Sequence, residues 1–217
     1  MNDQHTQLDW KDGRTPVSTR FDDPYYSLES GLEEACHVFL QGNDLPARAR
    51  AGFHIAELGF GTGLNLLATF DALRDHSGPF FYTSFEAFLM TRDEMARALR
   101  AFPSLDPAPL LDYWGAERFA LGPFTVRLIF GDARETLPSW EGQADAWYLD
   151  GFSPAKNPEL WTPELMAAVA AHTATGGTFA TYTAAGHVRR ALAAAGFEVS
   201  RIPGYGRKRH MCRGHLP

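Results

Sequence analysis

The stretch ELGFGTGLN, residues 57–65, decides the fold because it joins a strand-like run to a helix-like run through a glycine-rich turn. The apolar segment FHIA before it is typical of a buried strand, and LNLLATFDALRD carries apolar residues at helical spacing. Three alternate glycines occupy the turn: Gly59, Gly61 and Gly63. A parallel sheet binds ligands at such turns, outside the carboxyl ends of its strands. The stretch therefore predicts an α/β fold with a ligand cleft at this position.

The spacing of the glycines narrows the class of ligand. The pattern G-x-G-x-G differs from the G-x-G-x-x-G of dinucleotide sites, and the Lys-Ser/Thr pair of a P-loop is missing. With Glu57 at its start, the turn is better suited to binding a nucleoside that carries an amino-acid tail than one that carries a pyrophosphate. The alternative is a tight turn between strand and helix that binds no ligand.

Strand-like and helix-like segments alternate along the rest of the chain, and the helix at TRDEMARALRAF begins with a capping box, Thr91 with Glu94. The further predicted strands are 80–86, 124–130, 145–150 and 176–183, the further helices 163–173 and 184–196, and the closing antiparallel pair 197–204 with 208–212. This alternation predicts a Rossmann-like, mostly parallel sheet with helices on both faces.

Size and composition indicate a globular chain: it has 217 residues, 45% of them hydrophobic and 21% charged. Residues 1–52, with a predicted helix at 31–42, are expected to form an extension that caps the cleft of a domain over 53–217. The polar start and the lack of a long apolar run predict a cytoplasmic protein without a membrane segment. Cys36 and Cys212 show no metal-binding spacing, so no metal is expected. The sequence carries no signal of oligomeric state.

Charge is distributed unevenly along the chain. The net charge is −6, yet residues 187–217 hold seven basic residues and one acid, so this end is +6 and the first 186 residues are −12. A basic end on an acidic body suits a local phosphate contact rather than general polyanion binding. The alternative is a solvated, solubilising surface.

Acidic residues follow successive predicted strands. Glu86 ends the second strand, where a carboxylate accepts hydrogen bonds from ribose hydroxyls, and Asp132 follows the third, in position to face an adenine amino group. Asp150 ends the fourth strand. Each alone is consistent with a helix N-cap, Asp132 in particular, but together they outline a cleft.

These residues resemble a class I S-adenosylmethionine-dependent methyltransferase. Further segments narrow the resemblance: FDDPYYS (21–27), GLEEACHVFL (31–40), LDGFSPAKNPELW (149–161), GGTFATYTAAGHVRRAL (176–192) and GYGRKRHM (204–211). With ELGFGTGLN they are similar to the methyltransferase part of the bifunctional enzyme family that completes 5-methylaminomethyl-2-thiouridine at the tRNA wobble position. In that family an oxidoreductase part with bound FAD follows; this chain stops just after Cys212, so no flavin is expected.

The resemblance implies a seven-stranded sheet with a reversed last strand and methyl transfer from S-adenosylmethionine to the primary amine of 5-aminomethyl-(2-thio)uridine at position 34. It also implies contact with the tRNA anticodon stem-loop. The residues assigned to the cofactor are Glu57, Gly59, Gly61, Thr62, Gly63, Glu86, Asp132 and Ala133.

The stretch AWYLDGFSPAKNPELW, residues 146–161, carries the predicted chemistry. Asp150 is the candidate catalytic residue, since a carboxylate there orients an amine and stabilises the cation that forms, as a base or as a positioner. Two prolines stiffen the loop after it. The candidate substrate-binding residues are Lys156 (phosphate), Trp161 (base stacking), Tyr26 (closing over the site), and Arg207, Lys208 and Arg209 (anticodon-arm backbone). For Trp161 the alternative is core packing.

Three other functions fit parts of the pattern. The first keeps S-adenosylmethionine but methylates an amine of a small molecule or a protein. The second transfers an aminopropyl group from decarboxylated S-adenosylmethionine, since those enzymes also pair a glycine loop with a strand-end aspartate. The third is a non-catalytic RNA-binding module, which the joint presence of Glu86, Asp132 and Asp150 disfavours.

Overall fold

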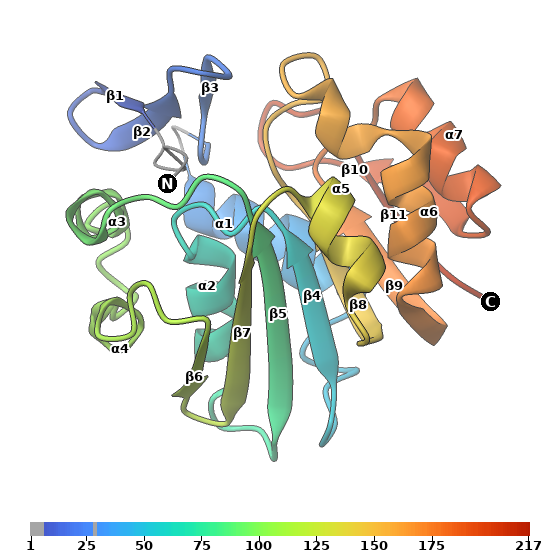
Figure 1. The fold of residues 1–217 in the computed structure, drawn as a ribbon, viewed down its shortest axis with the longest axis horizontal. Helices are drawn as coiled ribbons and strands as arrows, with labels where there is room; N and C mark the ends of the chain where they lie inside the picture. The colour runs from blue at the N-terminus through green and yellow to red at the C-terminus, as the bar shows by residue number, and fades with distance from the viewer. Residues whose placement is uncertain (1–6, 28–29) are drawn as a thin grey trace.

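The computed structural model describes residues 7–27 and 30–217, and its centre is an eight-stranded sheet of order β10-β11-β9-β8-β4-β5-β7-β6 (Figure 1). The strands are β4 (His54–Leu58), β5 (Phe80–Glu86), β6 (Arg118–Leu121), β7 (Phe124–Phe130), β8 (Ala144–Leu149), β9 (Thr173–Thr181), β10 (Glu198–Pro203) and β11 (His210–His215). The neighbours β9, β8, β4, β5 and β7 run parallel, and β11 is antiparallel to both β9 and β10.

The predicted fold class is confirmed, with one strand more than expected. Seven strands form the expected sheet with the last strand, β11, reversed, and β6 adds an antiparallel eighth at the edge beside β7. The turn between β6 and β7 contains Gly122 at φ +53, and a Cβ there would lie 2.6 Å from the ring of Phe70. A four-residue edge strand carries too little alternation to be recognised in the sequence.

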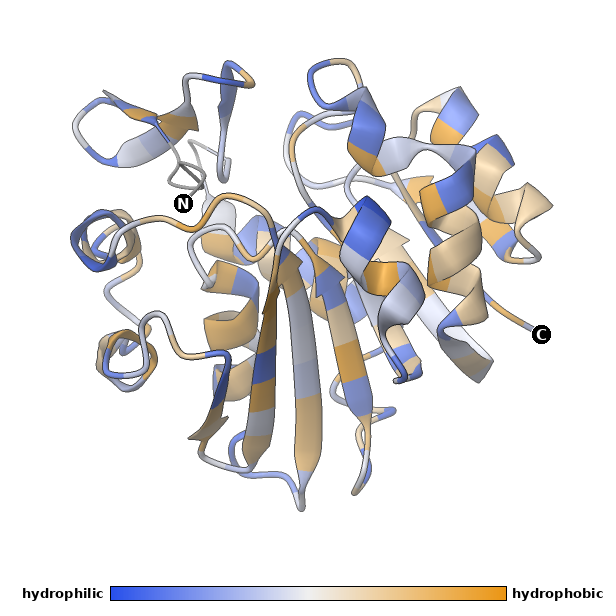
Figure 2. Cartoon of the chain, viewed as in Figure 1, coloured by the Kyte–Doolittle hydropathy of each residue, from blue (hydrophilic) through white to orange (hydrophobic). Residues whose placement is uncertain are grey.

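Helices cover both faces of the sheet because alternate strand residues point to opposite sides. On one face Ile55, Tyr82 and Tyr148 join a core cluster, and on the other Ala56, Phe85 and Trp147 join a second. The first cluster includes residues of α1 (Gly31–Ala35), a π-helical turn (Cys36–Leu40), α2 (Leu64–Leu73), α3 (Arg92–Leu99) and α4 (Ala108–Leu111). The second includes residues of α5 (Ala133–Thr136), α6 (Pro163–Ala171), α7 (Gly186–Ala194) and the 3₁₀ helices Leu137–Ser139 and Pro158–Trp161. Figure 2 shows hydrophobic residues concentrated along the central strands.

The segment before β4 has two parts. β1 (Leu8–Lys11), β2 (Thr15–Ser18) and β3 (Asp23–Pro24) form a small antiparallel sheet near the carboxyl ends of the central strands (Figure 1). The predicted helix at 31–42 is present as α1, the π-helical turn and a 3₁₀ helix over Gln41–Asn43, and it packs against the central sheet. A division of the chain at residue 52 stays a prediction.

Two local predictions hold in detail. Thr91 and Glu94 form the reciprocal capping box at the start of α3, and β10 pairs with β11 as the closing antiparallel pair. Across residues 7–27 and 30–217, no helix has the length and apolar character needed to span a membrane.

Candidate active site

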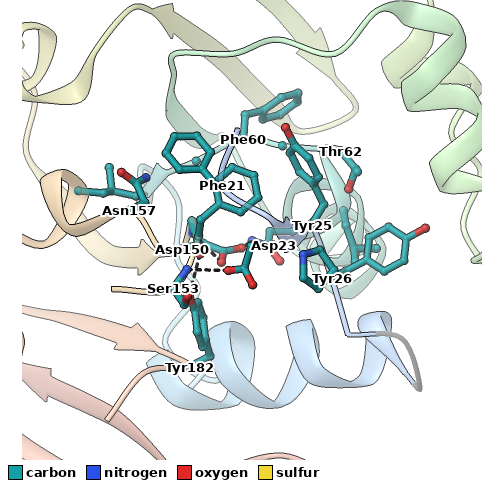
Figure 3. A pocket seen from close by; sticks show the side chains of 18 of the residues that line it. Phe21, Asp23, Tyr25, Tyr26, Phe60, Thr62, Asp150, Ser153, Asn157 and Tyr182 are labelled. Carbon is teal, nitrogen blue, oxygen red and sulfur yellow. Dashed lines mark hydrogen bonds between the residues drawn. The ribbon is translucent and has the colours of Figure 1, made fainter. Parts of the chain in front are cut away.

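A cleft of about 840 Å³ lies at the carboxyl ends of the central strands (Figure 3). Its wall combines the glycine loop, the ends of β5, β7 and β8, the N-terminal segment around residues 20–27, and the loops 150–160 and 205–208. This volume is that of a site for a small molecule or cofactor. The ligand cleft predicted from the glycine loop is therefore present where the sequence pattern put it.

The glycine loop depends on backbone conformations that favour glycine. Gly59 and Gly63 have φ values of +81 and +75, and a Cβ on Gly63 would lie 2.6 Å from Leu110 Cδ2. Gly59, Gly61 and Thr62 line the cleft, whereas Gly63 lies behind it at the N-terminus of α2. The positive φ of Gly63 gives it a role in the turn itself, and its contact with the cofactor stays a prediction.

Glu57 lies beneath the cleft, not in its wall. Its carboxylate is fully buried and accepts hydrogen bonds from Asn65 Nδ2 (2.9 Å) and Ser84 Oγ (2.7 Å). Burial raises the pKa of Glu57 to about 8, against the lowering effect of these two donors. Asn65, which lines the cleft, donates to Glu57 from the cleft side, and a contact between Glu57 and the cofactor stays a prediction.

Glu86 lies in the cleft wall where β5 ends. Its carboxylate accepts hydrogen bonds from the backbone N–H groups of Gly61 (2.8 Å) and Phe88 (2.7 Å), so it fixes the glycine loop. Burial raises the pKa of Glu86, and these N–H groups oppose the shift. Each carboxylate oxygen retains a lone pair for a ligand hydroxyl.

Asp132 is both a cleft residue and a helix N-cap, the two placements considered for it. It lines the cleft beside Ala133, and it also caps α5 by accepting the backbone N–H of Arg134 (2.9 Å). The Arg134 guanidinium binds the same carboxylate and lowers the pKa of Asp132. The alternative of a helix N-cap is confirmed without removing Asp132 from the cleft.

Asp150 lies in the cleft wall directly after β8. Its Oδ2 accepts a hydrogen bond from Asn65 Nδ2 (2.8 Å), and its Oδ1 accepts the backbone N–H of Gly151 (2.8 Å). Burial raises the pKa of Asp150 to about 6; the hydrogen bonds and the positive charge of Lys208 lower it, and Glu34 raises it. The carboxylate is thus held in one orientation and is mostly ionised at neutral pH.

The loop after Asp150 is tied to the N-terminal segment. Asp23 Oδ2 accepts the backbone N–H of Ser153 (2.8 Å), drawn as a dashed line in Figure 3, and the Lys156 ammonium pairs with Asp22 (3.1 Å) and Asp23 (3.7 Å). The ring of Phe21 stacks on Phe152, with 4.7 Å between centroids. Lys156 therefore joins the loop to the N-terminal segment, and its predicted phosphate contact stays a prediction.

Trp161 is corrected from a stacking surface to a core residue. It is 2% exposed, belongs to the second core cluster and donates its Nε1–H to the carbonyl of Phe152 (2.9 Å). A base cannot reach its ring. The core-packing alternative considered for this tryptophan is the one that the structure has.

Tyr26 lines the cleft, but its hydroxyl group is hydrogen-bonded to backbone carbonyls of the protein. It donates toward the carbonyls of Arg14 and Ala98, both at 3.1 Å, and its ring packs edge-on against Phe102. Burial raises the pKa of Tyr26 to about 12. These contacts anchor the N-terminal segment.

The three basic residues predicted to contact the tRNA backbone belong to the loop between β10 and β11, and they do not all lie in the cleft. Arg207 and Lys208 line the cleft, whereas Arg209 is exposed outside it. The Lys208 ammonium lies 2.7 Å from Glu34 Oε1 and 4.4 Å from the ring centroid of Tyr182. Lys208 therefore points into the site, not toward a nucleic-acid backbone outside it.

Several cleft residues were absent from the sequence prediction. Asn65 was quoted at the end of the glycine stretch, but its contact with Asp150 depends on the first turn of α2 facing the end of β8. Tyr182 follows β9, and its hydroxyl donates to the Gly151 carbonyl (2.8 Å). Glu34 comes from α1. Pattern reasoning along one segment cannot detect contacts between segments this far apart.

The strand order, the reversed strand β11 between β9 and β10, the glycine loop and the acids at the strand ends define a class I S-adenosylmethionine-dependent methyltransferase. The profile of the S-adenosyl-L-methionine-dependent methyltransferase family matches residues 108–217. The chain belongs to this family.

Curated proteins of similar sequence point to a narrower group within this family. The chain is 44% identical over 233 residues to the tRNA 5-methylaminomethyl-2-thiouridine biosynthesis bifunctional protein MnmC of Chromobacterium violaceum, covering 100% of this chain and 35% of that protein. The protein of the same name from Caulobacter sp. is 46% identical over 229 residues, covering 97% and 38%. The chain thus spans about a third of the length of the curated relatives it matches.

A solved structure agrees with this resemblance. MnmC2 from Aquifex aeolicus superposes with a TM-score of 0.80 at 27% identity, covering 97% of this chain and 70% of that one. The family resemblance inferred from the six sequence segments is confirmed by these comparisons.

Proposed function

We propose that this chain methylates the primary amine of 5-aminomethyl-(2-thio)uridine at the tRNA wobble position, giving the 5-methylaminomethyl nucleoside. The names of its relatives support this acceptor. The structural observation that carries it is Asp150, a carboxylate in the cleft wall beside the glycine loop, oriented by two hydrogen bonds. The proposal places the protein in the cytoplasm with its tRNA.

The cleft fits S-adenosylmethionine on the chemistry of its walls. Gly61 lines the cleft without a side chain, so a ligand can approach the loop backbone there. Glu86 offers carboxylate lone pairs for ribose hydroxyls, and Asp132 with Ala133 offers the edge for an adenine. Bound S-adenosylmethionine supplies a sulfonium methyl carbon, whose bond to sulfur breaks as its bond to the amine nitrogen forms.

Asp150 prepares the amine in this proposal. A primary alkyl amine is mostly protonated at neutral pH and must lose a proton before its lone pair reacts. A carboxylate with a pKa of about 6 accepts hydrogen bonds from the ammonium and relays one proton to solvent; the ionised carboxylate then stabilises the secondary ammonium that forms. Orientation by Asn65 and Gly151 directs the nitrogen, and alignment alone is worth roughly 7–11 kcal/mol.

The rim of the cleft suits a single-stranded loop of RNA. Arg207 lines the cleft and is exposed, and the exposed Arg209 lies two residues away, both in the loop between β10 and β11. Guanidinium groups bind phosphate oxygens, and a wobble base in the anticodon stem-loop is reached without opening a duplex. The N-terminal segment 7–27 then acts as the cap of the cleft.

The test uses labelled S-adenosylmethionine and tRNA carrying 5-aminomethyluridine at the wobble position, with the digested nucleosides resolved. Label is expected in the methylaminomethyl nucleoside, and Asp150→Asn is expected to lower the rate at least about a hundredfold. Asp112→Asn, an exposed aspartate outside the cleft, is the matched control. Cofactor binding with no label in this tRNA would contradict the acceptor and leave a small-molecule or protein amine.

A further inference from the structure

One alkyl ammonium group already lies inside the cleft. Lys208 reaches in from the loop between β10 and β11, and its Nζ lies 2.7 Å from Glu34 Oε1. The same Nζ lies 4.4 Å from the centroid of the Tyr182 ring. A carboxylate on one side and an aromatic ring on the other form a binding site for an alkyl ammonium.

Glu34 and Tyr182 are both fixed before any ligand arrives. Glu34 belongs to α1 and is 8% exposed, so its carboxylate cannot turn out to solvent freely. The Tyr182 hydroxyl donates to the carbonyl of Gly151, the residue that follows Asp150. The ring is therefore held beside the predicted catalytic carboxylate.

This cation site borders Asp150 closely enough to act on it electrostatically. The positive charge of Lys208 lowers the pKa of Asp150 and the negative charge of Glu34 raises it. All four side chains line one cleft. An ammonium bound between Glu34 and Tyr182 is thus next to the group proposed to prepare an amine for methylation.

Lys208 holds its place weakly. Its side chain is 47% exposed, so solvent competes for the ammonium of Lys208, whereas the Glu34 side chain is only 11% exposed and needs a cationic partner. Its loop also carries Arg207 and Arg209, so RNA phosphates near the cleft would attract the whole loop. An incoming ammonium can therefore replace Lys208 at small cost.

We infer that Glu34 and Tyr182 form the subsite for the acceptor's alkyl ammonium group, and that Lys208 occupies it until the acceptor arrives. The inference rests on the proposed function for the identity of the acceptor, a primary amine on a one-carbon arm. The subsite explains selection for a cation: a neutral or anionic substituent would displace Lys208 and leave Glu34 without a partner.

The inference is tested with propylammonium chloride as the probe and the full chain carrying ¹³C-labelled tyrosine rings. The Tyr182 signal is assigned by its loss in Tyr182→Phe. In Lys208→Met, propylammonium is expected to shift this signal saturably, with an affinity at least about tenfold above that of the parent, where Lys208 competes. Lys208→Gln is a second variant that removes the ammonium group from the subsite. Propanol, the neutral analogue, is expected to cause no shift.

Glu34→Gln in the Lys208→Met background is expected to remove the response to propylammonium. Glu33→Gln in the same background is the matched control, because Glu33 is exposed on the same helix and should leave the response intact. Equal response to propanol, or no gain in affinity on removing Lys208 in either variant, would overturn the inference and make the Lys208–Glu34 pair a loop anchor only.

The readout needs neither RNA nor methyl transfer. A failure of the probe to bind therefore leaves the proposed methylation intact. Probe binding without methylation of the aminomethyl tRNA would instead remove the proposed acceptor while keeping the subsite.

Discussion

Asn65 Nδ2 donates a hydrogen bond of 2.8 Å to Asp150 Oδ2, and the same amide group donates one of 2.9 Å to Glu57 Oε1. One side chain from the first turn of α2 therefore connects a fully buried carboxylate to the carboxylate in the cleft. The consequence is that the orientation and the acidity of Asp150 depend on a residue outside the predicted catalytic set.

Asn65→Ala is expected to change the pH dependence of methyl transfer. If the ionised form of Asp150 is active, the rate rises with pH through the carboxyl pKa of about 6. Removing a donor that lowers this pKa moves that rise to higher pH, and it should lower kcat/KM by roughly tenfold or more. The pH–rate profile checks both. Ser84→Ala, which removes only the second donor to Glu57, should leave the profile in place.

Glu57→Gln is expected to make stability less dependent on pH. The folded pKa of about 8 lies above the ordinary 4.5, so the stabilising contribution of protonated Glu57 is complete below pH 4.5 and is lost as pH rises to about 8. Between pH 5.5 and 8.5 the variant should gain roughly 2–4 kcal/mol of unfolding free energy relative to the parent. Urea unfolding at several pH values measures this; the exposed Glu117→Gln should show no such trend.

Asp23→Ala is expected to weaken cofactor binding without unfolding the protein. Asp23 joins the N-terminal segment to the loop after Asp150 through Ser153, so its loss opens the cleft. Titration calorimetry with S-adenosylhomocysteine should show a Kd raised by about tenfold, the usual effect of losing a hydrogen bond to a charged group. Asp22→Ala is the control, since the Asp22 side chain is 92% exposed and pairs only with Lys156 among the described contacts. An unchanged Kd in Asp23→Ala would show that this closure is not needed.

Trp161→Ala is expected to lower stability rather than RNA affinity. The buried ring should cost about 3–5 kcal/mol of unfolding free energy when truncated, while Trp161→Phe should cost less because most of the packing remains. Binding of the anticodon stem-loop at a temperature where both variants are folded should match the parent. A selective loss of RNA affinity would restore the stacking role. Trp114→Ala, at a 37% exposed position, is the comparison for stability.

The parts of the site that follow local rules could be predicted, and the parts that depend on distant packing could not. The glycine loop, Glu86 and Asp132 lie at strand ends, and strand ends follow from alternation and turn residues along one segment. The partners of Lys156 and Lys208 lie 134 and 174 positions earlier in the chain, at Asp22 and Glu34.

The burial of Trp161 illustrates the same limit. An aromatic residue at the start of a helix fits either a core or an exposed surface, and only the packing of α6 on the sheet decides between them. Lys208 is similar, because its direction depends on the turn joining β10 to β11 and on the helix α1 opposite.

The contact between Asp23 and Ser153 also sets an order of events during synthesis. The two residues are 130 positions apart, so a ribosome working at about 5–20 residues per second releases the second on the order of ten seconds after the first. Through that interval Phe21 has no Phe152 ring to stack on. The cleft therefore cannot close before residue 153 has been synthesised, and a chain stalled before residue 150 holds the glycine loop and the segment 7–27 without the Ser153 anchor or the Asp150 carboxylate.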